Sequence, residues 1–268
     1  MKAEVIISRD NSLLRRVRAV RDGKVDDTIF VEGLRLCEEA VHSGLPIEAV
    51  VISEELARKE KAGVLLNELD DLPIRIASVS EGLLGSISYT KTPQGIIMLA
   101  KRPCWDADRF EASLSRTPLL VVMNSLNNPV NVGAIIRTAE AAGASGVIAT
   151  TNSADPFSPK SLRGAMGSAF RLAIWTGANY ADVISWCAKN QIETVCADVE
   201  GETDYTNIDW TKPRALIMGP ESTGLTPDEV ALANTVVKIP MHGQVESLNV
   251  GVAAAILLYE AARQRRSM

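Results

Sequence analysis

One short stretch of this sequence combines residue types that could do chemistry. Residues 127–148 read NNPVNVGAIIRTAEAAGASGVI, a buried-helix pattern except for Arg137, which follows the bare glycine Gly133 by four residues. Residues four apart share a helix face, so a missing side chain beside a guanidinium leaves space for a substrate to reach that charge. Such a charge can stabilise an oxygen on which negative charge develops. Two structural interpretations stay open: Asn131 could cap the helix, and Arg137 could pair with a carboxylate.

A second stretch, IMGPESTGLTPDEV, predicts a buried strand, a loop and a helix. Thr226 and Glu229 have the spacing of a capping box, with Pro227 at the first helical position. The loop contains Gly219 and Gly224, and glycine lets backbone groups approach a ligand closely. Neither the G-x-G-x-x-G fingerprint nor the phosphate-binding P-loop is present, which disfavours a nicotinamide enzyme and a nucleotide hydrolase.

The third stretch, IPMHGQVESLNVGVAAAILLYE, predicts a strand, a loop and a long helix. Ser247 stands at the expected cap position of that helix. The helix is apolar almost all round, so it must be covered on most sides, in the centre of a domain or at a subunit interface. The polar Ser-Leu-Asn at its entrance needs partners, because an unpaired buried polar group costs roughly 1–3 kcal/mol.

Alternating strands and helices must position these three loops. From residue 117 onward, PLLVVMN, GVIAT, RALIMG and VVKIPM predict strands, and such near-continuous apolar runs are typical of a parallel sheet covered on both faces. In open α/β sheets, ligands bind in loops at the carboxyl ends of strands. We therefore expect the three loops to gather at one edge of a sheet.

The first hundred residues also alternate in type. Strands are predicted at TIFVEG, EAVVIS, PIRIAS and QGIIMLA, and helices at LRLCEEAVHSG, EELARKEKAGVLLNEL and SEGLLGSI. This pattern favours a small sheet with helices packed on it. The segment KRPCWDADRFEASLSRTP then breaks the pattern with prolines and mixed charge. We expect an α/β protein with one domain over residues 1–100, a linker over 101–116 and a second domain over 117–268.

Composition limits the classes of function. With 268 residues, 46% of them apolar, the chain can form two globular domains, and it contains no uninterrupted apolar run of membrane-spanning length. Four widely spaced cysteines and only two histidines argue against a metal site and a disulfide scaffold. The N-terminus lacks a signal-peptide pattern. A reducing cytoplasm fits these features best.

The net charge of −5 is awkward for a nucleic-acid-binding protein, but the charges are unevenly distributed. Residues 1–24 carry seven basic side chains, including Arg15, Arg16 and Arg18, against three acidic ones. They form either a local basic face for RNA or an ordinary solvated helix. Arg163, in SPKSLRGAMGS, is a further candidate for a phosphate contact, with a surface ion pair as the alternative.

The three stretches read, in order, N-x-G-x-x-x-R, G-x-E-x-x-G-L, and I-P-M followed by S-L-N-V. This order resembles the SpoU (TrmH) family of RNA ribose 2′-O-methyltransferases, part of the SPOUT superfamily, over about residues 117–268. The first hundred residues, with FVEG and GIIMLA, look like the ribosomal-protein-like substrate-binding domain that often precedes it. The resemblance implies a deep trefoil knot near the C-terminus, a methyl donor bound in the knotted loops, and a homodimer.

The resemblance also implies roles for single residues. Arg137 matches the residue that activates the ribose 2′-hydroxyl, and Asn131 the one that helps to hold it. The other matched positions of the catalytic motifs are Glu221, Ser247 and Asn249. The positions expected around S-adenosyl-L-methionine, which the family binds largely by backbone groups, are Met218, Gly219, Ile239, Met241 and Leu248.

We therefore expect a cytoplasmic, metal-free enzyme that methylates the ribose 2′-hydroxyl of RNA. The additional N-terminal domain favours ribosomal RNA, in particular 23S, over transfer RNA. The alternatives are a transfer-RNA 2′-O-methyltransferase, a non-catalytic RNA-binding protein of the same fold, and another α/β enzyme that uses a nucleotide. The motifs depart from the family at Pro220, Ser222 and Gly251, which removes no residue assigned to chemistry but could alter donor affinity.

Overall fold

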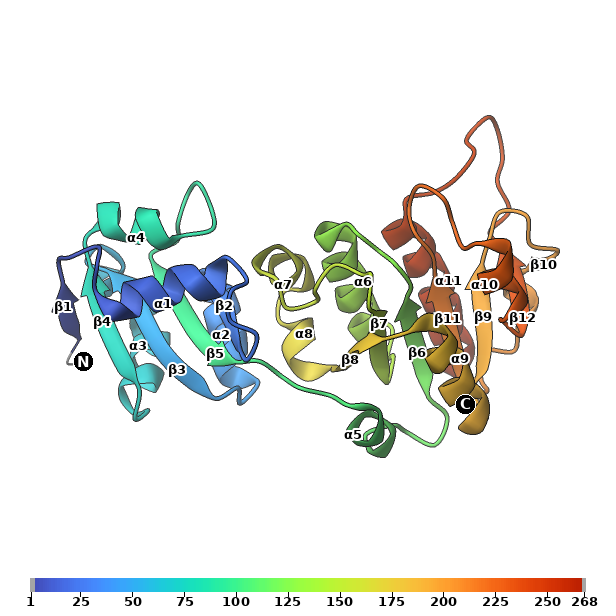
Figure 1. Ribbon diagram of the computed structural model, residues 1–268, viewed down its shortest axis with the longest axis horizontal. Coiled ribbons are helices and arrows are strands. Elements are labelled where there is room, and N and C mark those ends of the chain that lie inside the picture. The colour runs from blue at the N-terminus through green and yellow to red at the C-terminus, as the bar shows by residue number, and fades with distance from the viewer. Residues whose placement is uncertain (1–2, 267–268) are drawn as a thin grey trace. The chain divides into compact units, whose positions relative to one another are not determined.

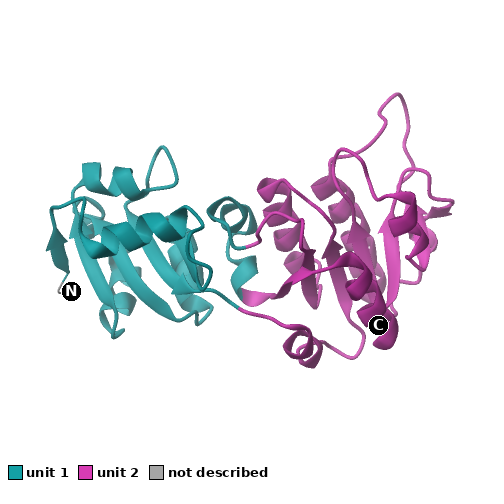
Figure 2. Cartoon of the chain, in the orientation of Figure 1, with its two compact units in different colours: residues 1–103, 157–170 teal, residues 104–156, 171–268 magenta. Residues whose placement is uncertain are grey.

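The computed structural model describes residues 3–266, which divide into two compact units (Figures 1 and 2). The first unit comprises residues 1–103 and 157–170, and the second comprises residues 104–156 and 171–268. Both units combine helices with a sheet, which is mixed in the first unit and parallel in the second. The α/β class predicted from the alternation of the sequence is confirmed.

The first unit is built on a mixed sheet of order β1-β4-β3-β5-β2. β4 pairs parallel with β1 and β3, whereas β5 pairs antiparallel with β3 and β2. The strands are β1 (Glu4–Ile6), β2 (Thr28–Glu32), β3 (Ile47–Ser53), β4 (Arg75–Val79) and β5 (Ile96–Lys101). All five residues of β2 are buried, which requires cover on both faces of the sheet.

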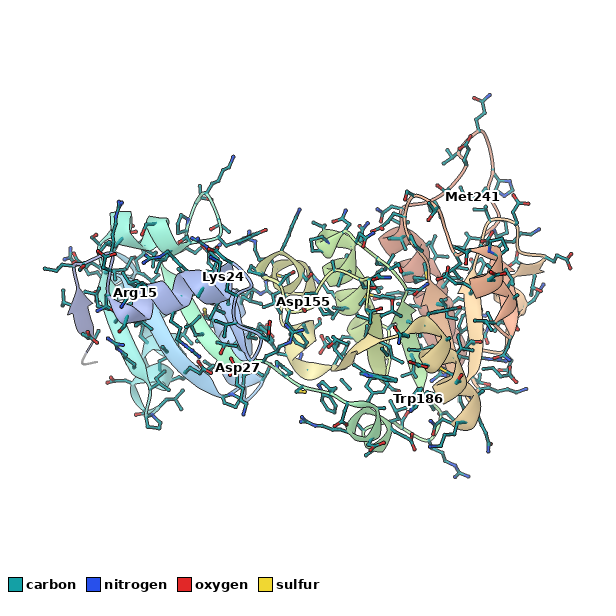
Figure 3. All side chains as sticks on the ribbon, viewed as in Figure 1. Arg15, Lys24, Asp27, Asp155, Trp186 and Met241 are labelled. Atoms are coloured by element: carbon teal, nitrogen blue, oxygen red, sulfur yellow. The ribbon has the colours of Figure 1, made fainter. Side chains whose placement is uncertain are left out.

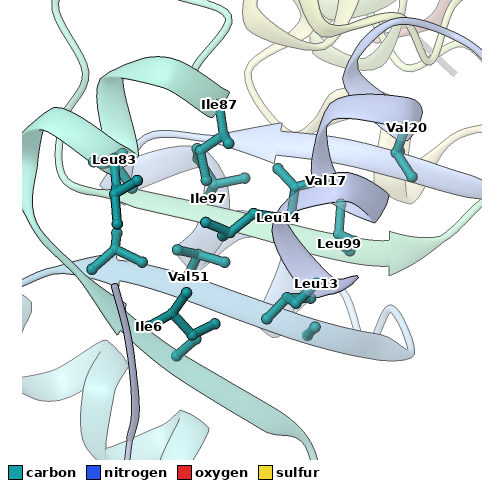
Figure 4. Close-up of a cluster of buried hydrophobic side chains, with 14 of the residues drawn as sticks. Ile6, Leu13, Leu14, Val17, Val20, Val51, Leu83, Ile87, Ile97 and Leu99 are labelled. Carbon is teal, nitrogen blue, oxygen red and sulfur yellow. The ribbon is translucent and has the colours of Figure 1, made fainter. Parts of the chain in front are cut away.

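Helices supply that cover. They are α1 (Ser12–Arg21), α2 (Leu34–His42), α3 (Gly63–Asp70) and α4 (Glu81–Ile87), joined by α7 (Pro159–Ala165) and most of α8 (Ser168–Arg171). α1 and α4 share one apolar core with the sheet, in which Leu14, Val17 and Ile87 are completely buried (Figure 4). This core holds α1 and α4 side by side on one face of the sheet.

One predicted helix is divided in the structure. EELARKEKAGVLLNEL contains two short 3-10 helices, η1 (Leu56–Arg58) and η2 (Glu60–Ala62), before α3 begins. Lys59 between them is extended, with φ −89° and ψ 123°. Leu56 and Ala62 are both buried, but in a continuous helix residues six apart point about 120° away from each other. The break lets both side chains reach the core.

The second unit is built on a parallel sheet of order β10-β12-β9-β11-β6-β7-β8. The strands are β6 (Leu119–Met123), β7 (Gly146–Thr150), β8 (Ala173–Ala178), β9 (Glu193–Ala197), β10 (Thr203–Asp204), β11 (Arg214–Met218) and β12 (Thr235–Lys238). The central strands β6, β7 and β11 are buried along their whole length, as their apolar runs predict.

Helices cover this sheet too. They are α5 (Ala107–Ala112), α6 (Pro129–Ala141), α9 (Tyr180–Lys189), α10 (Pro227–Ala231) and α11 (Val250–Arg265), with the 3-10 helix η3 (Tyr205–Asn207). On one face, Phe110 of α5 and Trp186 of α9 pack with Trp175, with ring centroids 5.6–6.0 Å apart. α6 and α11 pack against each other on the opposite face (Figure 1). α6 and α11 thereby bring the first and third motifs together.

Candidate active site

The three predicted loops follow three strands of the second unit. β6 leads into residues 124–128, β11 into residues 219–226, and β12 into residues 239–249. β6 and β11 are direct neighbours, and only β9 separates β11 from β12. Because the strands are parallel, the three loops leave the sheet at the same edge.

α6 begins earlier than a cap at Asn131 would allow. Its cap is Asn128, whose side chain accepts a hydrogen bond from the backbone N–H of Val130 at 3.0 Å, and Pro129 occupies the first helical position. The interpretation of Asn131 as the cap is therefore wrong. Asn131 lies buried in the first turn, and its amide is free for contacts with the other two loops.

The sequence predicted Ser247 as the cap of α11, but the cap is Asn249. The Asn249 Oδ1 accepts hydrogen bonds from the backbone N–H groups of Gly251 at 2.9 Å and Val252 at 3.4 Å. Ser247 lies two residues before the cap, too far from the first turn to accept these bonds. The Asn249 amide nitrogen remains available to a neighbour.

A chain of side-chain hydrogen bonds joins all three loops. The Asn131 Nδ2 donates to Glu221 Oε1 at 3.0 Å, and the Asn249 Nδ2 donates to Asn131 Oδ1 at 3.3 Å. The Asn131 side chain thus donates a hydrogen bond to the second loop through Nδ2 and accepts one from the third loop through Oδ1. These pairs are 90 and 118 residues apart in the sequence, so folding assembles the three motifs into one site.

A cavity of about 340 Å³ lies beside this hydrogen-bond chain. Its lining includes Glu221, Ser247 and the loop of residues 197–199 after β9. The five residues expected around a methyl donor all line it: Met218, Gly219, Ile239, Met241 and Leu248. Residues 197–199 were not predicted, because Ala-Asp-Val at a strand end matches no glycine-rich or family motif that would mark a ligand loop.

Two glycines shape the second loop for different reasons. A Cβ on Gly219 would lie 2.9 Å from the backbone nitrogen of Leu225, so only glycine lets the loop fold back on itself. Gly224 has open space around it but a φ of +65°, a conformation that glycine adopts without strain. Pro220 and Ser222, where the motif departs from the family pattern, both line the cavity.

A second group of hydrogen bonds supports the loops, and only its capping box was predicted from the sequence. Glu229 forms the predicted capping box, accepting at Oε2 from the N–H and the hydroxyl of Thr226 at 2.8 and 3.0 Å. Its Oε1 accepts from Nδ2 of the buried Asn124 at 2.8 Å, and Asn124 Oδ1 accepts from the Thr150 hydroxyl at 3.0 Å. Burial raises the pKa of Glu229, but the hydrogen bonds from Thr226 and Asn124 outweigh it and hold this pKa below its usual value.

Arg137 is exposed on α6 and does not line the cavity. Gly133, one turn earlier, is buried, so it opens no solvent space beside the guanidinium, contrary to expectation. Its neighbour Ala134 faces α11, where a Cβ on Gly251 would lie 3.8 Å from the Ala134 Cβ. Small residues therefore bring α6 close to α11. Within residues 3–266 no carboxylate pairs with Arg137, and the ion-pair alternative has no support.

The four candidate RNA-binding arginines differ in their partners. Arg16 forms an ion pair with Glu48, with 2.6 Å between Nη2 and Oε2, and Arg18 donates to a backbone carbonyl of the preceding segment at 2.7 Å. Arg15 on α1 and Arg163 in the last turn of α7 are exposed. Neither has a side-chain partner in the part of the chain that the structure describes.

The groups that line the cavity suit an organic ligand. Apolar side chains and loop backbone dominate its lining. Nowhere in the described residues do three or more His, Cys, Asp or Glu side chains form a group that could hold a metal ion. None of the described helices has the length and apolar character needed to cross a membrane.

Known proteins share this architecture. The model of the SpoU rRNA Methylase family matches residues 118–259, and that of the MRM3-like substrate binding domain matches residues 13–98. Over 243 residues the chain is 32% identical to the 23S rRNA (uridine(2479)-2′-O)-methyltransferase of Streptomyces viridochromogenes, covering 89% of this chain and 83% of that protein. Over 245 residues it is 27% identical to the 23S rRNA (guanosine(2553)-2′-O)-methyltransferase of Bacillus subtilis, covering 91% and 92%.

A solved structure of an rRNA methyltransferase is also similar to this chain. The crystal structure of an AdoMet-bound rRNA methyltransferase from Sinorhizobium meliloti matches with a TM-score of 0.84 at 29% identity, covering 97% of this chain and 98% of that one. Both halves of the chain therefore have counterparts in one protein. This chain belongs to the SpoU rRNA methylase family, as the order of its three motifs predicts.

Proposed function

We propose that this chain transfers a methyl group from S-adenosyl-L-methionine to the ribose 2′-hydroxyl of a nucleotide in 23S ribosomal RNA. The observation that carries the proposal is the hydrogen-bond chain from Asn249 through Asn131 to Glu221, beside one cavity, in a member of this family. Relatives named as 23S rRNA 2′-O-methyltransferases favour ribosomal over transfer RNA. The same substrate favours a cytoplasmic enzyme.

The cavity fits the methyl donor in size and chemistry. A volume of about 340 Å³ is within the range of small-molecule sites. Apolar walls and loop backbone suit an adenine ring, and Asp198 and Ser247 add polar groups. When bound, S-adenosyl-L-methionine supplies a methyl group on a positively charged sulfur. We assign its binding to Met218, Gly219, Ile239, Met241 and Leu248, which line the cavity.

We assign activation of the ribose hydroxyl to Arg137. An arginine cannot serve as the base, since its pKa exceeds about 12. Its guanidinium instead lowers the pKa of the hydroxyl and stabilises the negative charge that develops on oxygen, while an RNA phosphate accepts the proton. Exposure, and the lack of an ion-pair partner among the described residues, leave this charge available to RNA.

The remaining motif residues orient the reacting groups. Asn131 is held from both sides, which fixes its amide, and Glu221 lies between this amide and the cavity. Ser247 lines the cavity two residues before Asn249, which caps α11. Correct orientation of the hydroxyl and the methyl group is worth several kcal/mol of the barrier. We assign Asn131, Glu221, Ser247 and Asn249 to this orientation.

We assign RNA binding to residues 1–100 and methyl transfer to residues 117–268. The family model that matches residues 13–98 describes a substrate-binding domain, which supports the first assignment. Arg15 and Arg163 carry accessible charges for phosphates. Arg16 and Arg18 must exchange an existing partner to do the same.

We further propose that two copies pair through α11 and that the C-terminal segment is knotted. Val252 and Tyr259, seven residues apart and so on one face of α11, are 49% and 50% exposed. Such an apolar face is stabilised when a second copy covers it. After β12, residues 239–249 return past the 219–226 loop to α11, a course that is compatible with a knot. Tyr259→Arg should give a monomer in sedimentation experiments, and a monomeric wild type would contradict the dimer.

A methyl-transfer assay tests the proposed function. The purified chain is incubated with labelled S-adenosyl-L-methionine and, separately, with 23S rRNA and total transfer RNA. We expect label at a ribose of 23S rRNA, and the loss of one 2′-O-methyl group from 23S rRNA in cells without the gene. Label in transfer RNA alone would support the transfer-RNA alternative. Donor binding without label in either RNA would support a non-catalytic RNA-binding protein.

A further inference from the structure

A buried carboxylate in the first unit holds a surface loop. Glu32, the last residue of β2, is only 4% exposed. Its Oε2 accepts hydrogen bonds from the backbone N–H groups of Tyr89 at 3.0 Å and Thr90 at 3.1 Å, and its Oε1 accepts from the Thr90 hydroxyl at 2.7 Å. A buried carboxylate is tolerated because such donors surround it. Glu32 thus fixes the start of the loop of residues 88–95, between α4 and β5.

The other end of the 88–95 loop is fixed as well. The Gln94 side-chain oxygen accepts from the backbone N–H of Leu34 at 3.3 Å, and Gly33 N–H donates to the carbonyl of Ile96 at 3.1 Å. Gly95 has a φ of +91°, and a Cβ there would lie 2.7 Å from the Cβ of Leu56. The FVEG segment and Leu34 therefore hold both ends of the 88–95 loop. The tip of this loop projects beyond α4 (Figure 1).

This clamped loop displays an aromatic ring and a positive charge. Tyr89 is 44% exposed, and Lys91 and Thr92 are exposed. The loop contains no acidic residue. An ordered aromatic ring on the surface can stack on any base, and recognition of RNA by proteins mostly targets unpaired bases that can be stacked in this way. Because the backbone is already fixed, little ordering remains to oppose binding.

The basic side of α1 lies next to the loop. Arg21 donates from Nη1 to the carbonyls of Ser86 and Ser88, both at 3.3 Å, which joins the end of α1 to the start of the loop. Residues 12–24 contain five basic side chains and one acidic one, Asp22, which is paired with Arg21 at 2.8 Å. Figure 3 labels Lys24 beyond the end of α1, and its side chain is exposed.

We propose that the 88–95 loop and the adjoining end of α1 form the surface on which the first unit binds an unpaired nucleotide of the substrate RNA. Tyr89 stacks on the base, and Lys91 and Lys24 contact the flanking phosphates. Glu32 is a positioning residue that acts through the loop. The inference rests on the proposed function and goes beyond it, because it names the element of the first unit that contacts RNA.

Variants of two exposed residues test this surface. In the full chain, Tyr89→Ala should weaken binding of a 23S rRNA transcript about tenfold to a hundredfold, and Tyr89→Phe, which keeps the ring, should bind like the wild type. Lys91→Ala should lower the salt slope of binding by about one. Lys101→Ala is the matched control, since Lys101 is exposed at the opposite end of β5 and should have no effect.

Binding of S-adenosyl-L-methionine distinguishes a failure of this proposal from a failure of the proposed function. All of these variants should bind S-adenosyl-L-methionine like the wild type, because the cavity is in the other unit. If the wild type methylates RNA and Tyr89→Ala binds RNA equally well, the surface is wrong while the function stands. If no RNA is methylated but Tyr89→Ala still weakens RNA binding, the function is wrong while the surface stands.

Glu32→Gln tests the positioning role. The neutral amide can keep the three contacts only by donating to the Thr90 hydroxyl, and the two N–H bonds lose their charged acceptor and become weaker. Amide hydrogen exchange at residues 89 and 90 should become faster, and RNA affinity should fall severalfold with unchanged circular dichroism. Unchanged exchange together with weakened RNA binding, or faster exchange with unchanged binding, would overturn this role.

Discussion

Both units use a carboxylate to hold a loop, but the carboxylate of the second unit also bonds to a side chain of a different loop. In the first, Glu32 bonds to backbone and hydroxyl groups of one loop, which then projects outward. In the second, Glu229 bonds to its own helix cap and also to Asn124 in a different loop. Asn131 adds a further link between the first, second and third motifs.

This difference follows from what each unit binds in the proposed function. A small donor must be aligned with its acceptor to within fractions of an ångström, which requires loops fixed relative to each other. A large RNA is bound through an accessible surface, where one rigid loop is sufficient. Changes in the second unit should therefore affect donor binding or the chemical step, and changes in the first should affect RNA affinity alone.

The largest effect should come from Arg137→Ala. Loss of a charge that stabilises the developing oxyanion should lower the rate of methyl transfer about a hundredfold to a thousandfold. Donor binding, measured by calorimetry, should be nearly unchanged, because Arg137 does not line the cavity. Arg116→Ala serves as control, since Arg116 is exposed between α5 and β6, away from the three motif loops and from α11. Methyl transfer at the wild-type rate would exclude Arg137 from the chemistry.

Asn131→Asp should break the link between the loops in a pH-dependent way. The new carboxylate would face Glu221 across the present 3.0 Å hydrogen bond, and two like charges at that distance repel. Donor affinity and turnover should fall about tenfold to a hundredfold at neutral pH. Both should recover partly toward pH 5, where the pair can share a proton. Equal activity of Asn131→Asp and the wild type at pH 8 would show that this link is dispensable.

The sequence predicted local features better than links between distant segments. The capping box of Thr226 and Glu229 is correct because all of its atoms lie within one helical turn. The caps Asn128 and Asn249 were missed, because neighbouring Asn131 and Ser247 are equally good cap residues by type. Segment 54–69 has helical composition, but burial of both Leu56 and Ala62 divides it. Tertiary contacts decided each of these cases.

The candidate site shows the same limit. Motif order led to most of the residues that line the cavity, since those belong to the second and third motifs, but not to residues 197–199. The bond between Asn124 and Glu229 joins residues 105 positions apart, and nothing in either local sequence marks it. Gly133 looked like an opening beside Arg137, yet it is buried in the folded chain. These features depend on which helices meet, which no local pattern specifies.

Gly219→Ala and Gly224→Ala should distinguish the effect of steric crowding from that of backbone strain in the loop of residues 219–226. A methyl group on residue 219 meets backbone at 2.9 Å, so the loop must move and donor affinity should fall about tenfold. A methyl group on residue 224 meets nothing within 4 Å and should cost only about 1 kcal/mol of stability through its left-handed backbone. Donor titrations and thermal melts of the two variants test this pair. A larger loss of donor affinity for Gly224→Ala would reverse the assignment.

The smallest effect concerns the stability that Glu229 contributes. Glu229→Gln keeps one acceptor but loses the charge, and should lower the free energy of unfolding by about 1 kcal/mol at pH 7. The pKa of Glu229 in the folded chain is held below its ordinary value of 4.5, so the ionised carboxylate stabilises the fold above that value. The stability difference from the wild type should be constant near neutral pH and shrink as pH falls below 4.5. Melting curves over this range, with the exposed Glu246→Gln as control, test the prediction. A difference that grows in acid would mean that Glu229 is not a charged anchor, and the contrast with Glu32 would then lie in geometry alone.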